Sequence, residues 1–421
     1  MTEKKPIKFL KNDWKAIVAI LGSRGHYSVP ITFAKHEKLE LFYTDWYFYW
    51  GMNKKIRKQF INSPMKILRI ISTRFDPRLP IKKVKSFSLT GLLFIIALRY
   101  IHAPKIRNYI FLLRGFWFGK SITKFGFTNA SFVYGINNES VELFSGAIKC
   151  GLACVLEQCS APYKIRQELL LEETSLWQNW QKGKSSVNFT EFIHREEKEW
   201  KIANVILCGS KFVAEGLINC GVSSDKCKIV PYAVDVDQYY PRKLDREKRN
   251  DRLKILFLGE ICLLKGIQYL YNAIELLDSK SIEVQAAGLI TIKQDIAKKI
   301  GRKINLLGWL PRLEINRLLN WADVLVLPSI CEGSAMVTYE ALASGVPVIT
   351  TPNAGSPVQD GETGFIVPIR DAPAIADRLL RLMKDPQLLH QMSQQARKFA
   401  EEQLSWDAYA IRLLSACESV L

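Results

Sequence analysis

Two glutamates, Glu332 and Glu340, stand eight positions apart in the stretch of the chain that carries the most chemical information. An apolar run typical of a buried strand, residues 322–327, precedes them, and a second run, residues 346–350, follows them. This alternation predicts a buried strand, a sharp turn and a short helix that leads back to the sheet. Carboxylates at such a turn and on such a helix can accept hydrogen bonds from the hydroxyl groups of a sugar.

The turn and the helix between these strands have the properties of an anion site. Ser334 is a residue type that caps helices, and Gly345 is one that ends them. The first helical amides, about residues 335–337, have no partner inside the helix and favour an anionic group such as a diphosphate. Glu340, whose side chain tilts back toward the helix start, can then accept both hydroxyls of a ribose. Glu332, ahead of the helix, can accept hydroxyls of the group that the diphosphate carries.

This segment closely resembles the signature of retaining GT-B glycosyltransferases of family four, in which seven residues separate two glutamates. In that family the first glutamate holds the donor sugar and the second holds the ribose, which assigns these roles to Glu332 and Glu340. The family usually has Gly-Phe-Gly after the first glutamate, whereas this chain has Gly-Ser-Ala, so we expect a sugar pocket of different shape. The competing interpretation is an acid near a helix start and an acid on a solvated helix face. The resemblance places the following residues at the donor: Gly333, Ser334, Ala335, Met336 and Val337.

A second stretch, residues 255–266, resembles the element with which the same family holds the donor diphosphate. Gly259 follows a strand-like run, at the end of the strand where ligands of parallel sheets bind. Lys265 matches the family's lysine, which makes it a catalytic residue together with Glu332, because positive charge beside a leaving diphosphate is most valuable as the glycosidic bond breaks. The family's arginine is replaced by Glu260, a reversal of charge. The alternative for Lys265 is a solvated lysine at a helix start.

Two further positions correspond to family elements near the base and the acceptor. Residues 307–310 end a strand where the family's loop flanks the base, so Trp309 either stacks on the base or lies in the core, with Leu310 beside it. Many relatives carry a histidine after a mid-domain strand, and this chain has Gln158 at the comparable place. Gln158 is therefore assigned to the acceptor side by position alone.

A loop of small residues follows the first strand-like run, residues 16–21. Its Gly22 and Ser23 can let the backbone approach the donor phosphate. Arg24 and His26 of the same loop are candidates for the acceptor side, and Arg24 is also a candidate to replace the charge of the family's missing arginine. An ordinary turn is an equally good interpretation of this pattern.

The chain as a whole predicts an α/β protein. Strand and helix patterns alternate through the C-terminal half, and the N-terminal half is similar but is interrupted by an aromatic and basic insert, residues 46–130. The polar stretch 235–250 is typical of a linker. The predicted strands are residues 16–21, 39–43, 132–134, 152–156, 204–208, 254–258, 282–287, 304–307, 322–327, 346–350 and 364–367.

The resemblance implies the GT-B architecture, two Rossmann-like doubly wound parallel-sheet domains that face each other across a cleft. We expect an acceptor-binding domain over residues 1–240 and a nucleotide-sugar-binding domain over residues 241–404. A last helix, within residues 405–421, is expected to cross back to the first domain.

The charge of the chain is unevenly distributed. Its 421 residues carry a formal net charge of +18, and residues 1–125 hold 25 Lys and Arg against 6 Asp and Glu. Such an excess indicates an anionic partner. Residues 54–85 form a basic amphipathic stretch that either lies on an anionic membrane surface or is an ordinary surface segment. Nucleic acid is not expected as a partner, because no known nucleic-acid module accompanies the charge.

The remaining composition argues against disulfide, zinc and membrane-spanning classes. Nine cysteines are an odd number without metal-ligand spacing, and the five histidines are scattered. The most apolar run, residues 91–98, is far shorter than the roughly 20 residues of a spanning helix. We therefore expect a cytoplasmic protein. The alternative is a protein that is peripheral on the cytoplasmic face of the plasma membrane.

The resemblance implies an enzyme that moves a sugar from a nucleotide-diphosphate donor to a glycan or lipid-linked acceptor, with retention at the anomeric carbon. It implies neither cofactor nor metal ion, and it suggests a place in the synthesis of cell-surface polysaccharide or glycolipid. The alternative is a catalytically impaired GT-B scaffold that binds another transferase. Glu260 and the absent histidine favour that alternative, and the intact glutamate pair opposes it.

Overall fold

The computed structural model describes residues 13–101, 103–181, 189–241, 252–278 and 280–421. By its internal contacts the chain divides into two compact units. Unit 1 runs through Leu156 and includes residues 202–204 and 420–421, and unit 2 comprises residues 157–201 and 205–419. The predicted limits at residues 240 and 404 remain predictions. Most of the expected linker 235–250 lies outside the described part, from residue 242 onward.

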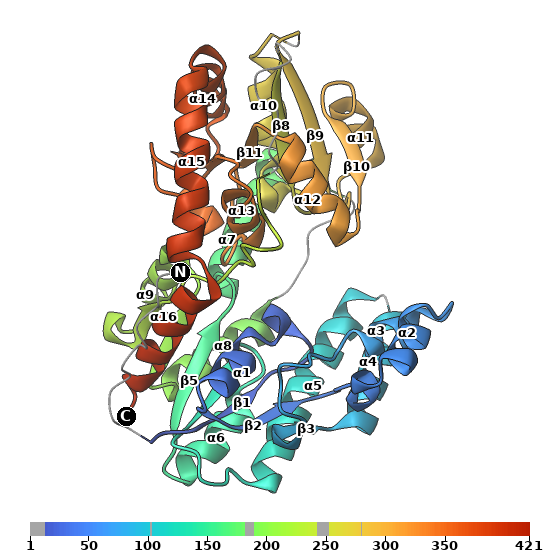
Figure 1. The fold of residues 1–421 in the computed structure, drawn as a ribbon, viewed down its shortest axis with the longest axis vertical. Coiled ribbons are helices and arrows are strands. Elements are labelled where there is room, and N and C mark those ends of the chain that lie inside the picture. Colours follow the sequence, from blue (N-terminus) through green and yellow to red (C-terminus); the bar gives the residue numbers. More distant parts are fainter. Residues whose placement is uncertain (1–12, 102, 182–188, 242–251, 279) are drawn as a thin grey trace, which may run out of the picture. The chain divides into compact units, whose positions relative to one another are not determined.

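Two sheets form the framework (Figure 1). The first contains seven strands in the order β3-β2-β1-β4-β5-β6-β7, with the bounds β1 Ala16–Ala19, β2 Leu39–Thr44, β3 Val84–Ser86, β4 Phe132–Ile136, β5 Ala153–Gln158, β6 Val205–Cys208 and β7 Cys227–Ile229. The second contains six in the order β10-β9-β8-β11-β12-β13, with the bounds β8 Leu253–Leu258, β9 Ile282–Ala287, β10 Asn305–Gly308, β11 Val324–Leu327, β12 Val348–Thr350 and β13 Gly364–Ile366.

Helices connect these strands. Those of the N-terminal half are α1 Ser28–Lys35, α2 Lys54–Ile61, α3 Lys66–Ser72, α4 Ser88–Tyr100, α5 Pro104–Phe125, α6 Val141–Lys149, α7 Tyr163–Leu176, α8 Thr190–Ile202 and α9 Lys211–Asn219. Those of the C-terminal half are α10 Ile267–Glu275, α11 Gln294–Ile300, α12 Arg312–Trp321, α13 Met336–Ala343, α14 Ala372–Lys384, α15 Pro386–Gln403 and α16 Trp406–Glu418.

The central strands of the second sheet, β8, β11 and β12, are buried on both faces, which explains why they are nearly continuous apolar runs, whereas β9 alternates between buried and partly buried residues. Along β8, Ile255 and Phe257 belong to one core cluster, and Leu256 and Leu258 belong to another. Successive side chains of a strand point to opposite faces, so the two clusters lie on the two sides of the sheet. Helices α10 and α14 contribute to the first cluster, and α13 and α15 contribute to the second.

Each sheet has a point at which the strand order reverses. In the first sheet this point lies between β1 and β4, and in the second it lies between β8 and β11. The strands paired at both points, β1 with β4 and β8 with β11, are parallel. Ligands of open α/β sheets bind in the crevice outside the carboxyl ends of the strands at such a reversal.

All predicted strands are present, with ends that differ by no more than two residues. Two short strands were not predicted, β3 and β7. Strand β3 lies inside the stretch taken for an insert, which therefore contributes an edge strand to the first sheet. A three-residue strand such as β3, in which only Val84 is buried, is too short to produce an alternating pattern.

The predicted cap of α13 is wrong. The helix begins at Met336, and its N-cap residue is Ala335 rather than Ser334. The hydroxyl of Ser334 instead donates to the Gly355 carbonyl at 3.1 Å and lies 2.7 Å from the hydroxyl of Tyr339. The end of the helix agrees with the prediction, because Gly345 has a φ of 67°, a backbone conformation that glycine adopts readily.

In the part of the chain that the structure describes, no helix has both the length and the apolarity needed to cross a bilayer.

Candidate functional site

The reversal point of the second sheet brings together the loops that follow β8 and β11. Gly266 directly follows Lys265, has a φ of 77°, and leaves only 1.9 Å between an added Cβ atom and the Pro328 carbonyl oxygen. Only glycine fits this contact, so the loop after β8 packs closely against the end of β11. The Ile330 amide donates to the Leu264 carbonyl at 2.8 Å and joins the two loops. This packing fixes the position of Lys265.

The two residues predicted to be catalytic are in contact. The ammonium of Lys265 forms an ion pair with the Glu332 carboxylate. Both side chains are largely buried, with 26% of Lys265 and 13% of Glu332 exposed. Burial lowers the pKa of Lys265, while Cys262 and Glu260 oppose the shift. Glu260 therefore acts on the electrostatics of Lys265, from the position at which the family has an arginine.

The turn that carries Glu332 has no room for a larger residue at position 333. A Cβ atom on Gly333 would lie 2.1 Å from the Cys159 carbonyl oxygen. The Gly333 carbonyl accepts a hydrogen bond from the Ser210 hydroxyl at 2.5 Å, and the Glu332 amide donates to the Asn353 carbonyl at 3.0 Å. These contacts hold the turn rigidly in front of α13.

The predicted group of free amides at the start of α13 is smaller than expected. The amide of Ala335 donates to the Ala354 carbonyl at 3.1 Å and is not available to a ligand. Met336 and Val337 occupy the first positions of the helix, whose amides have no partner within it. These two amides remain as the candidates for contact with a diphosphate.

Glu340 belongs to a three-residue network that the sequence did not indicate. Its Oε1 accepts a hydrogen bond from the Tyr239 hydroxyl at 3.0 Å and one from Nη2 of Arg312 at 3.4 Å. The Arg312 Nε also donates to the Tyr239 hydroxyl at 3.2 Å. Burial raises the pKa of Glu340, and Arg312 and Tyr239 oppose that shift. The network orients the carboxylate.

Arg312 and Tyr239 come from segments far from Glu340 in the sequence. Arg312 begins α12, and Tyr239 lies in the segment between β7 and β8. Burial raises the pKa of Tyr239 to about 12, so its hydroxyl stays protonated and able to donate at neutral pH. The proximity of Arg312 to the predicted base-flanking loop, residues 307–310, is the one hint that the sequence offered.

Trp309 does not lie in the core. Its side chain is 72% exposed, so the core alternative is wrong, and stacking on a base stays a prediction. Leu310, in contrast, packs partly buried against the second core cluster and anchors the loop. Gly259, at the end of β8, has a φ of 141°, and an added Cβ atom on the adjacent Gly288 would lie 1.7 Å from the Gly259 carbonyl oxygen. Backbone therefore packs against backbone at this point of the site.

Gln158 is part of a buried hydrogen-bond network rather than an exposed side chain. Its amide nitrogen donates to Glu196 at 2.7 Å and to the Ser160 carbonyl at 3.1 Å, and its oxygen accepts from the Trp200 indole at 3.0 Å. It is fully buried. The structure gives Gln158 a role in holding the loop after β5, and its assignment to the acceptor side gains no support.

The loop after β1 in unit 1 is held by two buried carboxylates. The Gly22 amide donates to Asp45 at 2.9 Å, and the approach of this backbone to a donor phosphate stays a prediction. Arg24 pairs with Glu139 at 2.7 Å, and the Leu21 amide donates to the same carboxylate at 3.1 Å. Ser23 precedes the short helix 24–27, in which His26 is exposed and has a φ of 50°.

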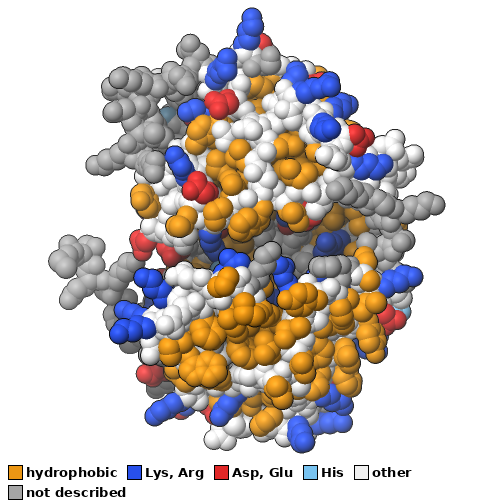
Figure 2. Space-filling model, turned by 90° about the vertical axis from the view of Figure 1, so that its right-hand side faces the viewer, with side chains coloured by type: hydrophobic (Ala, Val, Ile, Leu, Met, Phe, Trp, Pro, Cys, Tyr) orange, Lys and Arg blue, Asp and Glu red, His pale blue; other side chains and the backbone are white. Residues whose placement is uncertain are grey.

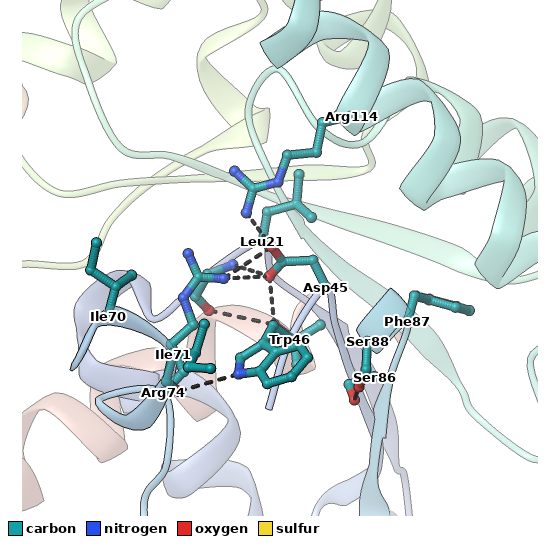
Figure 3. A network of polar contacts seen from close by, with 12 residues as sticks. Leu21, Asp45, Trp46, Ile70, Ile71, Arg74, Ser86, Phe87, Ser88 and Arg114 are labelled. Atoms are coloured by element: carbon teal, nitrogen blue, oxygen red, sulfur yellow. Dashed lines mark hydrogen bonds and ion pairs between the residues drawn. The ribbon is translucent and has the colours of Figure 1, made fainter. Parts of the chain in front are cut away.

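Asp45 is the centre of this arrangement (Figure 3). Arg74 and Arg114 both point at its carboxylate, Arg74 with an Nη1 to Oδ2 distance of 3.0 Å and Arg114 in direct ion-pair contact. Burial by itself would raise the pKa of Asp45, but the two guanidinium groups and the Gly22 amide outweigh it and lower the pKa. No local pattern indicated this cluster, because Asp45 follows β2, Arg74 follows α3 and Arg114 lies in α5.

The described residues contain no group of three or more His, Cys, Asp or Glu that could hold a metal ion.

Comparison with known proteins identifies the second half of the chain. Residues 242–399 match the family model for glycosyl transferases group 1. This segment is therefore similar to the glycosyltransferase group 1 domain. It contains Lys265, Glu332 and Glu340, so the three predicted donor residues lie inside the matched domain.

Curated relatives agree with this assignment over part of their length. The chain is 33% identical over 165 residues to the putative glycosyltransferase EpsD of Bacillus subtilis, covering 37% of this chain and 43% of that protein. It is 30% identical over 234 residues to a D-inositol 3-phosphate glycosyltransferase of Corynebacterium jeikeium, covering 49% and 55%. The chain spans about half the length of the curated relatives that it matches.

Solved structures extend the likeness to nearly the whole chain. Anabaena Alr3699/HepE in complex with UDP and glucose superposes with a TM-score of 0.60 at 14% identity, over 96% of this chain and 100% of that one. Sucrose-phosphate synthase from Thermosynechococcus elongatus superposes with a TM-score of 0.61 at 15% identity, over 96% and 99%. With its two α/β sheets, the chain therefore has the GT-B fold, as predicted.

Proposed function

We propose that this protein transfers a sugar from a nucleotide-diphosphate donor to a glycan or lipid-linked acceptor, with retention at the anomeric carbon. One observation carries the proposal. Lys265, Glu332 and Glu340 stand around one strand-order reversal of the sheet in the group 1 domain, where a nucleotide is expected to bind. Relatives named as glycosyltransferases support the same class of reaction.

Each of these side chains has a distinct role in the proposed reaction. Lys265 and the first amides of α13 stabilise the diphosphate as it leaves, because their positive charge faces the position where negative charge develops. Glu340 accepts the ribose hydroxyls while Arg312 and Tyr239 hold its carboxylate in place. Glu332 accepts hydroxyls of the donor sugar, for which its ion pair with Lys265 must open or shift.

The proposed reaction balances without a cofactor or a metal ion. The bond between the anomeric carbon and the diphosphate oxygen breaks, and a bond to the acceptor oxygen forms on the same face. The acceptor's hydroxyl proton passes to an oxygen of the leaving diphosphate. The charge that a metal would supply comes from Lys265 and the helix amides.

Glu260 favours a second candidate function, a GT-B scaffold with impaired catalysis that binds another transferase. This carboxylate influences Lys265 from the position of the family's arginine, so it opposes the accumulation of negative charge on a diphosphate. The same observation fits an active enzyme with a slow chemical step. The two candidates differ in whether any nucleotide sugar is turned over.

We further propose a cytoplasmic enzyme of cell-surface polysaccharide or glycolipid synthesis that works beside an anionic membrane, with nucleic acid excluded as a partner. The support is the basic excess of residues 1–125 and the likeness to EpsD and to an uncharacterised protein from the cps region of Klebsiella pneumoniae. Residues 54–85 would contact the lipid head groups through charge.

A panel of nucleotide sugars tests the function. Thermal shift first identifies the donors that bind, and mass spectrometry then detects transfer to lipid extracts and oligosaccharides. Lys265→Ala is the matched control for chemistry, because it should retain much of the donor binding and lose most of the turnover. Binding of a donor without turnover in any acceptor pool would favour the scaffold, and failure of every nucleotide sugar to bind would contradict the proposed sugar transfer.

A further inference from the structure

Helices α4 and α5 of unit 1 expose a row of large apolar side chains. On α4 these are Leu89, Leu93, Ile96 and Tyr100, and on α5 they are Ile106, Tyr109, Leu113 and Phe116. Their spacings of three and four residues place each set along one side of its helix. We call these eight residues the α4–α5 face. Figure 2 shows hydrophobic side chains gathered over the side of unit 1 that carries these helices.

The exposure of this face is large for a protein surface. Leu89 is 78% exposed, Tyr100 is 69% exposed and Tyr109 is 66% exposed. Single exposed apolar residues are ordinary, but a continuous group of this size marks an interaction surface.

Close packing on the buried sides of α4 and α5 prevents the helices from rotating their exposed apolar sides inward. On α4, Gly91 packs so closely that an added Cβ atom would lie 2.0 Å from the Asp45 carbonyl oxygen. On α5, Gly119 would place a Cβ atom 2.8 Å from the Leu143 amide of α6, and Phe118 and Ile122 are buried. Arg114 is buried in its ion pair with Asp45. Both helices are therefore fixed in rotation, with their apolar faces outward.

The charge around the face identifies its partner. Residues 77–138 contain ten Lys and Arg and no Asp or Glu. Exposed basic residues stand at the end of α4 and at both ends of α5: Arg99, Lys105, Arg107, Lys120 and Lys124. A second copy of the chain would bring two such basic rims together, which is unfavourable. An anionic lipid surface would pair with the rim and accept the apolar side chains, and tyrosines are well suited to the head-group boundary.

We propose that the α4–α5 face inserts into the interfacial layer of an anionic bilayer, with the surrounding Lys and Arg on the lipid head groups. The helices would lie in the plane of the interface rather than cross it. This surface is distinct from the basic amphipathic stretch 54–85, and the proposal does not depend on sugar transfer.

Vesicle co-sedimentation of the full chain tests the proposal, with phosphatidylcholine vesicles compared with vesicles that also contain phosphatidylglycerol. The wild-type chain should bind the anionic vesicles, and part of this binding should survive about 0.5 M salt, where charge attraction is screened within a few ångströms. The triple variant Leu89→Gln, Leu93→Gln, Tyr109→Gln should bind at least about tenfold more weakly, since apolar burial is lost. Replacement of Arg99, Lys105 and Lys120 by glutamine should remove the preference for anionic lipid.

Matched exposed leucines of unit 2 provide the control. Leu176 is 62% exposed and Leu276 is 60% exposed, and their replacement by glutamine should leave vesicle binding unchanged. Circular dichroism of each variant confirms that it is folded. Equal binding by the triple variant and the wild type would overturn the proposal. A wild-type dimer in sedimentation velocity that the triple variant abolishes would assign the face to a second copy, and would also overturn it.

Discussion

Glu340→Gln keeps the shape of a buried side chain but removes the charge to which Tyr239 and Arg312 donate. If the ribose hydroxyls bind this carboxylate, the variant loses hydrogen bonds to a charged acceptor, a loss of about 1.5–3 kcal/mol. The dissociation constant for the preferred nucleotide should then rise about 10- to 150-fold. The free energy of unfolding should not decrease by a comparable amount, because burial already disfavours the charged form of Glu340, as its raised pKa indicates.

The sign of the pH dependence follows from the same raised pKa. An acid whose pKa is raised on folding contributes stability that is present below its ordinary value of 4.5 and is lost as the pH rises through the folded value. Nucleotide binding, in contrast, requires the ionised form of the Glu340 carboxyl group. The affinity of the wild-type chain should therefore decrease as the pH is lowered through the folded pKa of Glu340, and this decrease should be absent in Glu340→Gln.

Calorimetric titration with UDP and GDP between about pH 5 and 8 measures both effects. Tyr239→Phe is the matched control, since it removes one neutral donor and leaves the carboxylate, so its cost should be only about 0.5–1.5 kcal/mol. Chemical denaturation of each variant separates binding from stability. An unchanged dissociation constant in Glu340→Gln, or the same pH profile in variant and wild type, would refute the ribose role.

Three further predictions concern other parts of the molecule. Lys265→Ala should lower kcat more than it raises the donor dissociation constant, and Glu260→Arg should raise kcat, because both act on charge that develops as the diphosphate leaves; steady-state kinetics would contradict this if Lys265→Ala kept full kcat. Trp309→Ala should weaken nucleotide binding by about 1–3 kcal/mol through lost stacking while stability changes by less than about 0.5 kcal/mol, as calorimetry and denaturation would measure; unchanged affinity would exclude a base contact. Asp45→Asn should destabilise the fold by about 3–5 kcal/mol because Arg74 and Arg114 lose their buried partner, whereas Glu215→Gln, at the exposed pair with Lys211, should cost at most about 1 kcal/mol; similar losses in urea unfolding would contradict the importance of burial.

The parts of the fold that follow from local patterns were predictable. Buried parallel strands produce continuous apolar runs, and the glycine turn from β11 into α13 indicates a helix start whose first amides favour an anionic group. The pair Lys265 and Glu332 was expected at one end of the sheet because both follow strands at their carboxyl ends. Their direct contact depends on Gly266, whose close approach to Pro328 only the folded chain reveals.

The parts that sequence reasoning missed depend on contacts between distant segments. Tyr239 and Arg312 lie 73 positions apart and meet on one oxygen of Glu340. Asp45 and Arg114 are separated by 69 positions and form the buried centre of unit 1. The local sequence around a charged residue does not identify such a partner, because solvated and buried charges have the same residue types. The wrong cap at Ser334 has the same cause, since Tyr339 and Gly355 take its hydroxyl.

A crystal structure of the chain with its preferred nucleotide sugar tests the central claim most directly. The account predicts the diphosphate within hydrogen-bond distance of the Lys265 ammonium and the first amides of α13, the ribose hydroxyls on Glu340, and the sugar on Glu332. In that state the ion pair between Lys265 and Glu332 should be open or shifted. A nucleotide bound elsewhere on the chain, with that ion pair intact, would contradict the account.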